Sequence, residues 1–245
     1  MPTYAPADEP RLLAAPRPSD GQARSVDGGD SSGERGLDPG DEGDPPAFGP
    51  DQVAGLGRGQ ALVFDRVLGS AAAALLAAEL RAMEGSLQPA AVGRSERRLY
   101  ATDVRSDWSC WLDRPEGADA GPLWRLFDVV AGELRDRAWL GMEGVEVQLA
   151  LYRGDSPGYL RHRDAFVGRG RRRATAIYYL NPNWRVGDGG ELQLFDEDGL
   201  GSERDVQPVL DRLVVFLSDR LEHAVRPCVA PRWAVTAWFL GPESP

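Results

Sequence analysis

The chain has 245 residues and a formal net charge of −10 at pH 7. This length suits one large domain or two small ones, and the acidic balance argues against a specific nucleic-acid binder, which needs a basic surface. Its two cysteines cannot form a disulfide framework, so we expect a reducing, cytoplasmic setting.

Residues 1–58 differ in composition from the rest of the chain. They hold eleven acidic residues against five arginines, with many glycines and prolines. Such a segment buries too little apolar surface to offset the entropy lost on ordering, so we expect a disordered acidic tail. We find no pattern of a secretory signal and no apolar run of membrane-spanning length, and we expect no membrane partner. The globular domain is therefore predicted to span residues 59–245.

Two helices and two short strands are predicted in the first part of this domain. The strands cover residues 61–64 and 108–112, and a hairpin or loop covers residues 87–103. Ser70 is a suitable N-cap for a helix over residues 71–83. Residues 121–140 show helical spacing, with one apolar stripe that we expect to pack on a sheet. The stripe comprises Leu123, Leu126, Val129, Val130 and Leu134.

From Val145 onward the apolar period changes to two residues, as in a half-buried strand. Further strands are predicted over residues 174–180, 191–195, 212–217, 223–228 and 233–240, separated by turns rich in glycine or proline. Helices followed by closely spaced strands favour an antiparallel architecture. We therefore predict a mainly β domain with supporting helices: a double-stranded β-helix, or jelly roll, braced by N-terminal α-helices.

The only two histidines of the chain are candidates for a metal site. His162 precedes Asp164 by two residues, so in a strand both side chains point to one face. His223 opens another predicted strand. Two histidines and one carboxylate leave coordination positions open, as in non-haem Fe(II) oxygenases. A lone His-x-Asp is common, however, and either histidine could equally be a surface residue or a hydrogen-bonded core residue.

Arg232 begins the last predicted strand and shares one face with Ala234, Thr236 and Trp238. An arginine among apolar residues requires an anionic partner, because an unpaired buried charge is very costly. Its fork geometry suits a carboxylate. Two partners are open: an acidic residue of the protein itself, or a dicarboxylate co-substrate that reaches from the metal to the arginine.

The second half of the chain carries a dense series of spaced motifs. They are Ile177-Tyr178-Tyr179-Leu180-Asn181, Trp184, Gly189-Gly190-Glu191-Leu192, Phe195, Asp211-Arg212-Leu213, Phe216, Ser218-Asp219-Arg220, His223-x-Val225 and Arg232-x-Ala234-x-Thr236-x-Trp238. In these motifs the chain resembles the prolyl 4-hydroxylase group of 2-oxoglutarate/Fe(II) oxygenases. It is most similar to the oxygen-sensing (HIF-type) prolyl hydroxylases and their bacterial relatives. The similarity is dense from about Val145 to Phe239 and weaker upstream.

The resemblance implies a role for individual positions. His162, Asp164 and His223 correspond to the iron ligands. Arg232 and Tyr179 match the residues that bind the distal carboxylate of 2-oxoglutarate. The walls of that pocket would be Ile177, Leu192, Val225, Thr236 and Trp238.

On the substrate side, the resemblance implies catalytic roles for Tyr152 and Arg105. Tyr152 corresponds to a tyrosine near the co-substrate and the substrate proline. Arg105 stands at the base of the loop that closes over the peptide in relatives, so residues 87–105 would be that loop. Asp107 and Tyr159 match positions behind the residues that touch the metal and the substrate.

The implied cofactors are Fe(II), the co-substrates 2-oxoglutarate and O2, and ascorbate. The implied reaction hydroxylates a prolyl residue of a protein or peptide and releases succinate and CO2. Because the metal carries the redox chemistry, no side-chain general base is required. We expect a monomer whose partner is a protein or peptide that contains proline.

Alternatives stay open at this point. The same cofactors would serve a free amino acid or a small metabolite, and a jelly roll can also be a non-catalytic, cupin-like metal-binding module. A bare metal module needs no dicarboxylate pocket, so the pair Tyr179 and Arg232 weighs against it. The basic turn at residues 168–173 is either a solvated loop or a rim that prefers an acidic peptide.

Overall fold

The computed structural model describes residues 42–90, 104–117, 120–166, 171–195 and 203–242. They belong to one compact unit, Leu37–Pro245. The helices are α1 (Pro50–Gly57), α2 (Ser70–Arg81), the 3-10 helix η1 (Ala82–Ser86) and α3 (Pro122–Asp136). The strands are β1 (Leu62–Asp65), β2 (Gln88–Pro89), β3 (Trp108–Trp111), β4 (Gly144–Tyr152), β5 (Tyr159–His162), β6 (Arg172–Tyr179), β7 (Leu192–Phe195), β8 (Glu203–Val206), β9 (Arg212–Leu217), β10 (Glu222–Val225) and β11 (Arg232–Leu240).

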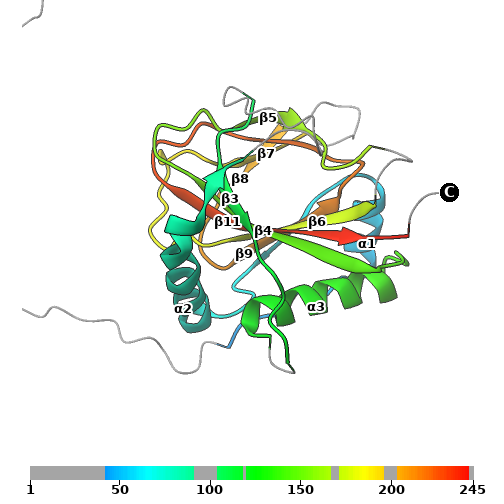
Figure 1. The fold of residues 1–245 in the computed structure, drawn as a ribbon. Helices are drawn as coiled ribbons and strands as arrows, with labels where there is room; N and C mark the ends of the chain where they lie inside the picture. The colour runs from blue at the N-terminus through cyan, green and yellow to red at the C-terminus, as the bar shows by residue number, and fades with distance from the viewer. Residues whose placement is uncertain (1–41, 91–103, 118–119, 167–170, 196–202, 243–245) are drawn as a thin grey trace, which may run out of the picture. The chain divides into compact units, whose positions relative to one another are not determined.

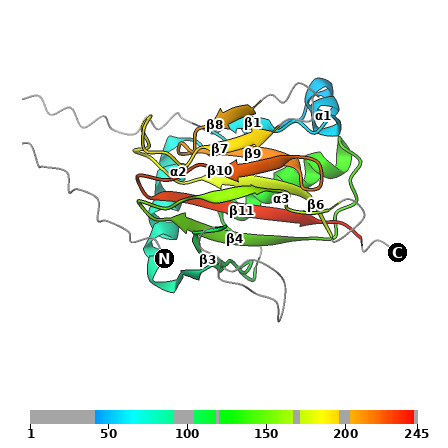
Figure 2. The same ribbon diagram turned by 90° about the horizontal axis from the view of Figure 1, so that it is seen from above.

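The strands form two sheets that face each other (Figure 1). The larger has the order β1-β9-β6-β11-β4-β3-β2, and the smaller has the order β5-β10-β7-β8. All neighbouring strands are antiparallel. Seen from above, the strands of the two sheets run in similar directions (Figure 2). The predicted jelly roll, mainly β with supporting helices, is confirmed.

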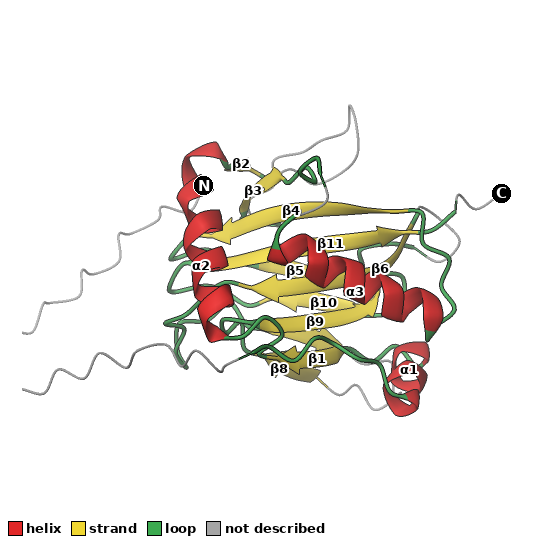
Figure 3. Ribbon diagram, turned by 90° about the horizontal axis from the view of Figure 1, so that it is seen from below, coloured by secondary structure: helices red, strands yellow, loops and turns green. Residues whose placement is uncertain are grey.

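The two faces of the larger sheet carry different side chains, because successive side chains of a strand point to opposite faces. The outer face packs on helices, and the inner face is turned toward the smaller sheet. On β4, Val147, Leu149 and Leu151 are buried in one core with α2 and α3. These helices lie across the outer face of the sheet (Figure 3). The alternate residues of β4, β6 and β11 face the smaller sheet. The alternation predicted from Val145 onward therefore sets which side chains reach the candidate site.

The helices differ from the prediction in detail. Gly69, with φ of 80°, is the residue before α2, and Ser70 is the first helical residue and not the N-cap. Glycine adopts this positive φ without strain. On α3 most of the predicted stripe is buried, but Val129 is 40% exposed. Trp124 and Phe127 occupy the core instead.

The folded unit begins before residue 59. Phe48 is 3% exposed and stacks on Phe64 of β1, with 5.7 Å between the ring centroids. Its backbone N–H donates to the Glu133 carboxylate of α3 at 2.6 Å. Helix α1 also precedes residue 59, so the predicted domain boundary is wrong. Residues 1–41, where the rest of the predicted tail lies, are outside the described residues.

None of the helices in the described ranges is both long enough and apolar enough to cross a membrane.

Candidate metal centre and co-substrate pocket

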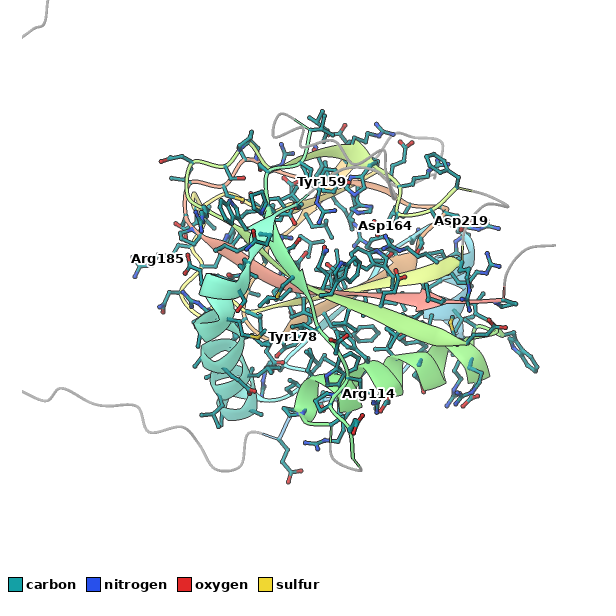
Figure 4. The ribbon with its side chains drawn as sticks, viewed as in Figure 1. Arg114, Tyr159, Asp164, Tyr178, Arg185 and Asp219 are labelled. Atoms are coloured by element: carbon teal, nitrogen blue, oxygen red, sulfur yellow. The ribbon has the colours of Figure 1, made fainter. Side chains whose placement is uncertain are left out.

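The three predicted metal ligands lie together. His162 ends β5, Asp164 follows two residues later, and His223 lies on β10. The two histidines are direct neighbours in the pairing of β5 with β10. One ligand atom from each of the three residues lies within 4.8 Å of the others. Figure 4 shows Asp164 and Tyr159 on the side of the larger sheet that faces β5.

Backbone contacts orient both imidazoles toward the carboxylate. His162 Nδ1 lies 2.7 Å from the Leu160 carbonyl oxygen, and His223 Nδ1 lies 3.4 Å from that of Leu221. A carbonyl oxygen can only accept, so Nδ1 is the nitrogen that carries a proton in each ring, and in a neutral imidazole of this tautomer Nε2 keeps the lone pair. Both Nε2 atoms lie 3.8 Å from the Asp164 carboxylate. This is the orientation that metal-binding histidines adopt.

The protonation states also suit a metal ion. Burial, assisted by the neighbouring His223, lowers the pKa of His162 to about 4, so the imidazole is neutral at neutral pH. Burial opposes ionisation of Asp164, but the two imidazoles and a hydrogen bond from Thr175 outweigh it and hold the pKa of this carboxyl below its usual value. Metal ligation requires neutral histidine and ionised carboxylate. Both are present.

A pair of hydroxyl groups behind Asp164 was missed by the sequence analysis. Thr175 Oγ1 donates to Asp164 Oδ2 at 2.7 Å and lies 2.9 Å from Ser218 Oγ. Because the single Thr175 proton goes to the carboxylate, the Ser218 hydroxyl donates to Thr175. Thr175 shares its face of β6 with Ile177 and Tyr179. That spacing places Thr175 on the inner face, but it does not indicate the contact with Asp164.

Arg232 lies at the other end of the inner face. It is 3% exposed, and its Nε donates to the Gly190 carbonyl oxygen at 2.7 Å. Its guanidinium lies 5.1 Å from the ring centroid of Tyr152 and 5.0 Å from that of Tyr179. No carboxylate of the described residues forms an ion pair with it. The structure therefore does not support the alternative that Arg232 pairs with an acidic residue of the protein.

Two more polar groups on this face lack partners. The buried hydroxyl of Tyr179 and the buried indole N–H of Trp238 make no hydrogen bond within the described part of the chain. Burial raises the pKa of Tyr179, so its hydroxyl stays protonated and can donate. Together with Arg232 it offers unpaired donors to a carboxylate. The donor set thus fits an anionic ligand that reaches toward the metal cluster.

The predicted pocket walls are close to these donors. Ile177, Leu192 and Val225 are buried, and Thr236 is half-buried. Ile177 is the direct neighbour of Thr236 in the pairing of β6 with β11. Leu192 is the neighbour of Val225 in the pairing of β7 with β10. The structure thus places two of these residues on each sheet.

The predicted catalytic residues Arg105 and Tyr152 lie beside the metal cluster and beside Arg232, respectively. The Arg105 guanidinium forms a two-point ion pair with Asp107, at 2.6 and 2.8 Å. It also lies over the ring of Tyr159, 5.3 Å from the centroid. Burial raises the pKa of Tyr152, which therefore remains a neutral phenol. Of the predicted loop at residues 87–105, positions 91–103 lie outside the described residues.

The arginines at the end of the basic turn have partners in the protein. Arg171 pairs with Glu143 at 2.7 Å and Arg172 with Glu146 at 3.0 Å. Arg173 donates to the Pro242 carbonyl oxygen. These contacts favour a structural role over the predicted rim for an acidic peptide. Residues 167–170 lie outside the described residues.

Known proteins share the fold and part of the sequence. The model of the 2OG-Fe(II) oxygenase superfamily matches residues 147–240. A solved prolyl-4-hydroxylase of Pseudomonas putida is 34% identical with a TM-score of 0.67, and the match covers 77% of this chain and 96% of that one. The chain belongs to the prolyl hydroxylase family of 2-oxoglutarate/Fe(II) oxygenases.

Two further relatives extend the comparison. A prolyl hydroxylase of Trichoplax adhaerens, solved with a peptide fragment of the hypoxia inducible factor oxygen degradation domain, is 28% identical to this oxygenase. Its TM-score is 0.65, and the match covers 77% of this chain and 86% of that one. The Mus musculus prolyl hydroxylase EGLN3 is 37% identical over 166 residues, which are 65% of this chain and 66% of the relative. The oxygenase spans from 26% to 66% of the length of the curated relatives it matches.

Proposed function

We propose that this oxygenase hydroxylates a prolyl residue in a protein substrate, consuming 2-oxoglutarate and O2 and releasing succinate and CO2. The observation that carries the proposal is the buried Arg232, which has no carboxylate partner among the described residues and lies on the face of the larger sheet that is turned toward the smaller one. The prolyl hydroxylase relatives support the choice of substrate.

The proposed roles divide the site into a metal end and an anion end. His162, Asp164 and His223 would hold Fe(II), which together with 2-oxoglutarate supplies the oxidising chemistry. Arg232 and Tyr179 would bind the distal carboxylate of the co-substrate through charge-assisted hydrogen bonds. The apolar walls exclude water from this contact and so strengthen it.

The remaining roles concern the substrate side. Tyr152 lies against Arg232 and would border both the co-substrate and the substrate proline. Arg105 would hold Tyr159 in place, because its guanidinium lies over that ring and the ring stacks on His162. In this proposal Arg105 acts through its neighbours and is a positioning residue.

The first test is conversion of 2-oxoglutarate to succinate by the purified protein with Fe(II). Arg232→Ala should raise the KM for 2-oxoglutarate at least about tenfold, because hydrogen bonds to charged groups contribute about 1.5–3 kcal/mol. The matched control is Arg185→Ala, since Arg185 is exposed and points away from the site (Figure 4). A His162→Ala variant with full turnover would refute the metal assignment.

The second test identifies the substrate class. A cell lysate is incubated with the wild-type protein or with inactive His223→Ala, and hydroxylation is detected as a mass shift. Hydroxyproline in a protein, found only with the wild type, is the expected result. An oxidised free amino acid or metabolite in its place would overturn the prolyl assignment and support the alternative with the same cofactors.

The proposal also includes ascorbate, a monomeric state and a cytoplasmic location. Ascorbate should increase the number of succinate turnovers before the enzyme loses activity. Analytical ultracentrifugation should give the mass of one chain, and fractionation of source cells should recover the protein with the cytoplasm.

A further inference from the structure

Gln148 is a buried polar residue on the inner face of β4 with no role in the site described above. It is 7% exposed. Its direct neighbours are Thr236 on β11 and Trp111 on β3. Because burying an unpaired amide is costly, the partners of this side chain indicate what it is for.

An ion pair fixes the direction of the Gln148 amide. Arg105, held by Asp107, donates from Nη2 to Gln148 Oε1 at 2.8 Å. A guanidinium has no acceptor, so only the amide oxygen can face it. The NH2 group is therefore turned away from Arg105. Its nitrogen has no hydrogen-bond partner in the described part of the chain and is not sealed from solvent.

The amide lies on the metal side of the site, away from the anion end. Arg105 forms an isolated β-bridge with Tyr159, whose ring stacks on His162 with 3.7 Å between centroids. Tyr152, beside the anion end, is four residues from Gln148 and thus about 13 Å away along β4. A co-substrate held between the metal ligands and the anion end leaves the Gln148 NH2 group available to a different molecule.

The charge around Gln148 is balanced, unlike that at the anion end. Arg105 is neutralised by Asp107, and Arg172 by Glu146. Arg232, in contrast, has no carboxylate among the described residues. A carboxylate needs a cation when it leaves water, whereas a carbonyl group needs only a hydrogen-bond donor. This side of the site therefore suits a neutral acceptor.

We infer that Gln148 is a specificity-determining residue whose Nε2 donates a hydrogen bond to a main-chain carbonyl oxygen of the substrate. The site then accepts a residue within a polypeptide, which presents such a carbonyl, and disfavours a free amino acid, which presents a carboxylate. This inference rests on the proposed function and specifies how the substrate is recognised.

The test uses a pool of blocked peptides with a central proline and randomised flanks, together with free L-proline. Gln148→Glu keeps an oxygen for Arg105 and replaces the NH2 donor with an anionic oxygen that can only accept. Gln148→Met removes both the donor and the acceptor. The matched control is Gln193→Met, because Gln193 on β7 lies between the inward-facing Leu192 and Leu194 and donates to Glu203 at 2.9 Å.

The expected result is a rise of about tenfold in the peptide KM for Gln148→Met, and a larger rise for Gln148→Glu. The KM for 2-oxoglutarate and the control variant should not change. A purely structural role predicts the reverse order, with Gln148→Glu tolerated, and that order would overturn the inference alone. Preference of the wild type for free L-proline would overturn it as well. If the wild type oxidises no peptide of the pool, the proposed function and this inference fail together.

Discussion

Replacing Thr175 by valine tests whether the hydroxyl pair behind Asp164 tunes the metal site. The substitution keeps the branched shape of the side chain but removes the donor that lies 2.7 Å from Asp164 Oδ2. A hydrogen bond to a charged group contributes about 1.5–3 kcal/mol. Its loss disfavours the ionised carboxylate that the metal requires, so the pKa of Asp164 should rise toward its usual value. We therefore expect the metal affinity to fall about 10- to 100-fold.

The assay is isothermal titration of the variant with Mn(II), which resists oxidation, in the presence of 2-oxoglutarate. Ser218→Ala is the matched comparison, because Ser218 contacts Thr175 and lies behind it as seen from the carboxylate. Its effect on the Mn(II) Kd should be several times smaller. Thermal unfolding of the metal-free proteins shows whether each variant is folded. An unchanged Mn(II) Kd in folded Thr175→Val would refute the reasoning.

Three further predictions concern the anion end, the core and pH. Gly190→Ala should raise the KM for 2-oxoglutarate, because a Cβ there would lie 2.8 Å from Arg232 Cδ. This close contact and the backbone φ of +76° should also lower the free energy of unfolding by about 1–3 kcal/mol. A variant with normal KM would contradict this. Tyr178→Phe should cost about 1–3 kcal/mol in urea unfolding and leave the KM unchanged, since its hydroxyl donates to Asp211 at 2.9 Å on the helix side of the sheet (Figure 4). In the metal-free protein, the pKa of His162 is about 4 when folded and about 6.5 when unfolded. The unfolded chain thus binds the proton more tightly. The free energy of unfolding should fall by up to about 3 kcal/mol between pH 6.5 and 4 and level off below, and a flat profile in urea titrations would contradict the burial argument.

The fold could be predicted largely because periodicity reports which face of a strand is buried. The alternation from Val145 onward placed β4 correctly, and the residues after Pro231 gave β11 together with its inner face. The strand β8 was missed because Glu203, Arg204 and Asp205 are exposed and show no apolar alternation. Its position is fixed by pairing with β7, which is a tertiary contact. The helix α1 was missed because its surroundings are acidic and rich in proline, and it is held by contacts remote in sequence.

The same contrast between local sequence pattern and tertiary contact applies to the residues of the site. His162, Asp164 and His223 could be predicted because imidazoles are rare in this chain and their spacing is informative. Thr175 and Gln148 could not, because a hydroxyl or an amide within an apolar strand is equally consistent with a satisfied core group. Only the contact with Asp164 or with Arg105 distinguishes each from an ordinary core residue.

The argument for a co-substrate depends on which arginines are neutralised. The chain holds 28 basic residues, all arginine, and 38 acidic ones, so most arginines can find a carboxylate. In the structure, Arg105, Arg172, Arg212 and Arg226 each do so. Arg232 is among the most buried, and no carboxylate of the described ranges pairs with it. The sequence could not distinguish these cases, because it shows that acids are abundant but not where they lie. A buried cation that stays unpaired in an acidic protein is best explained by a ligand that supplies the missing charge.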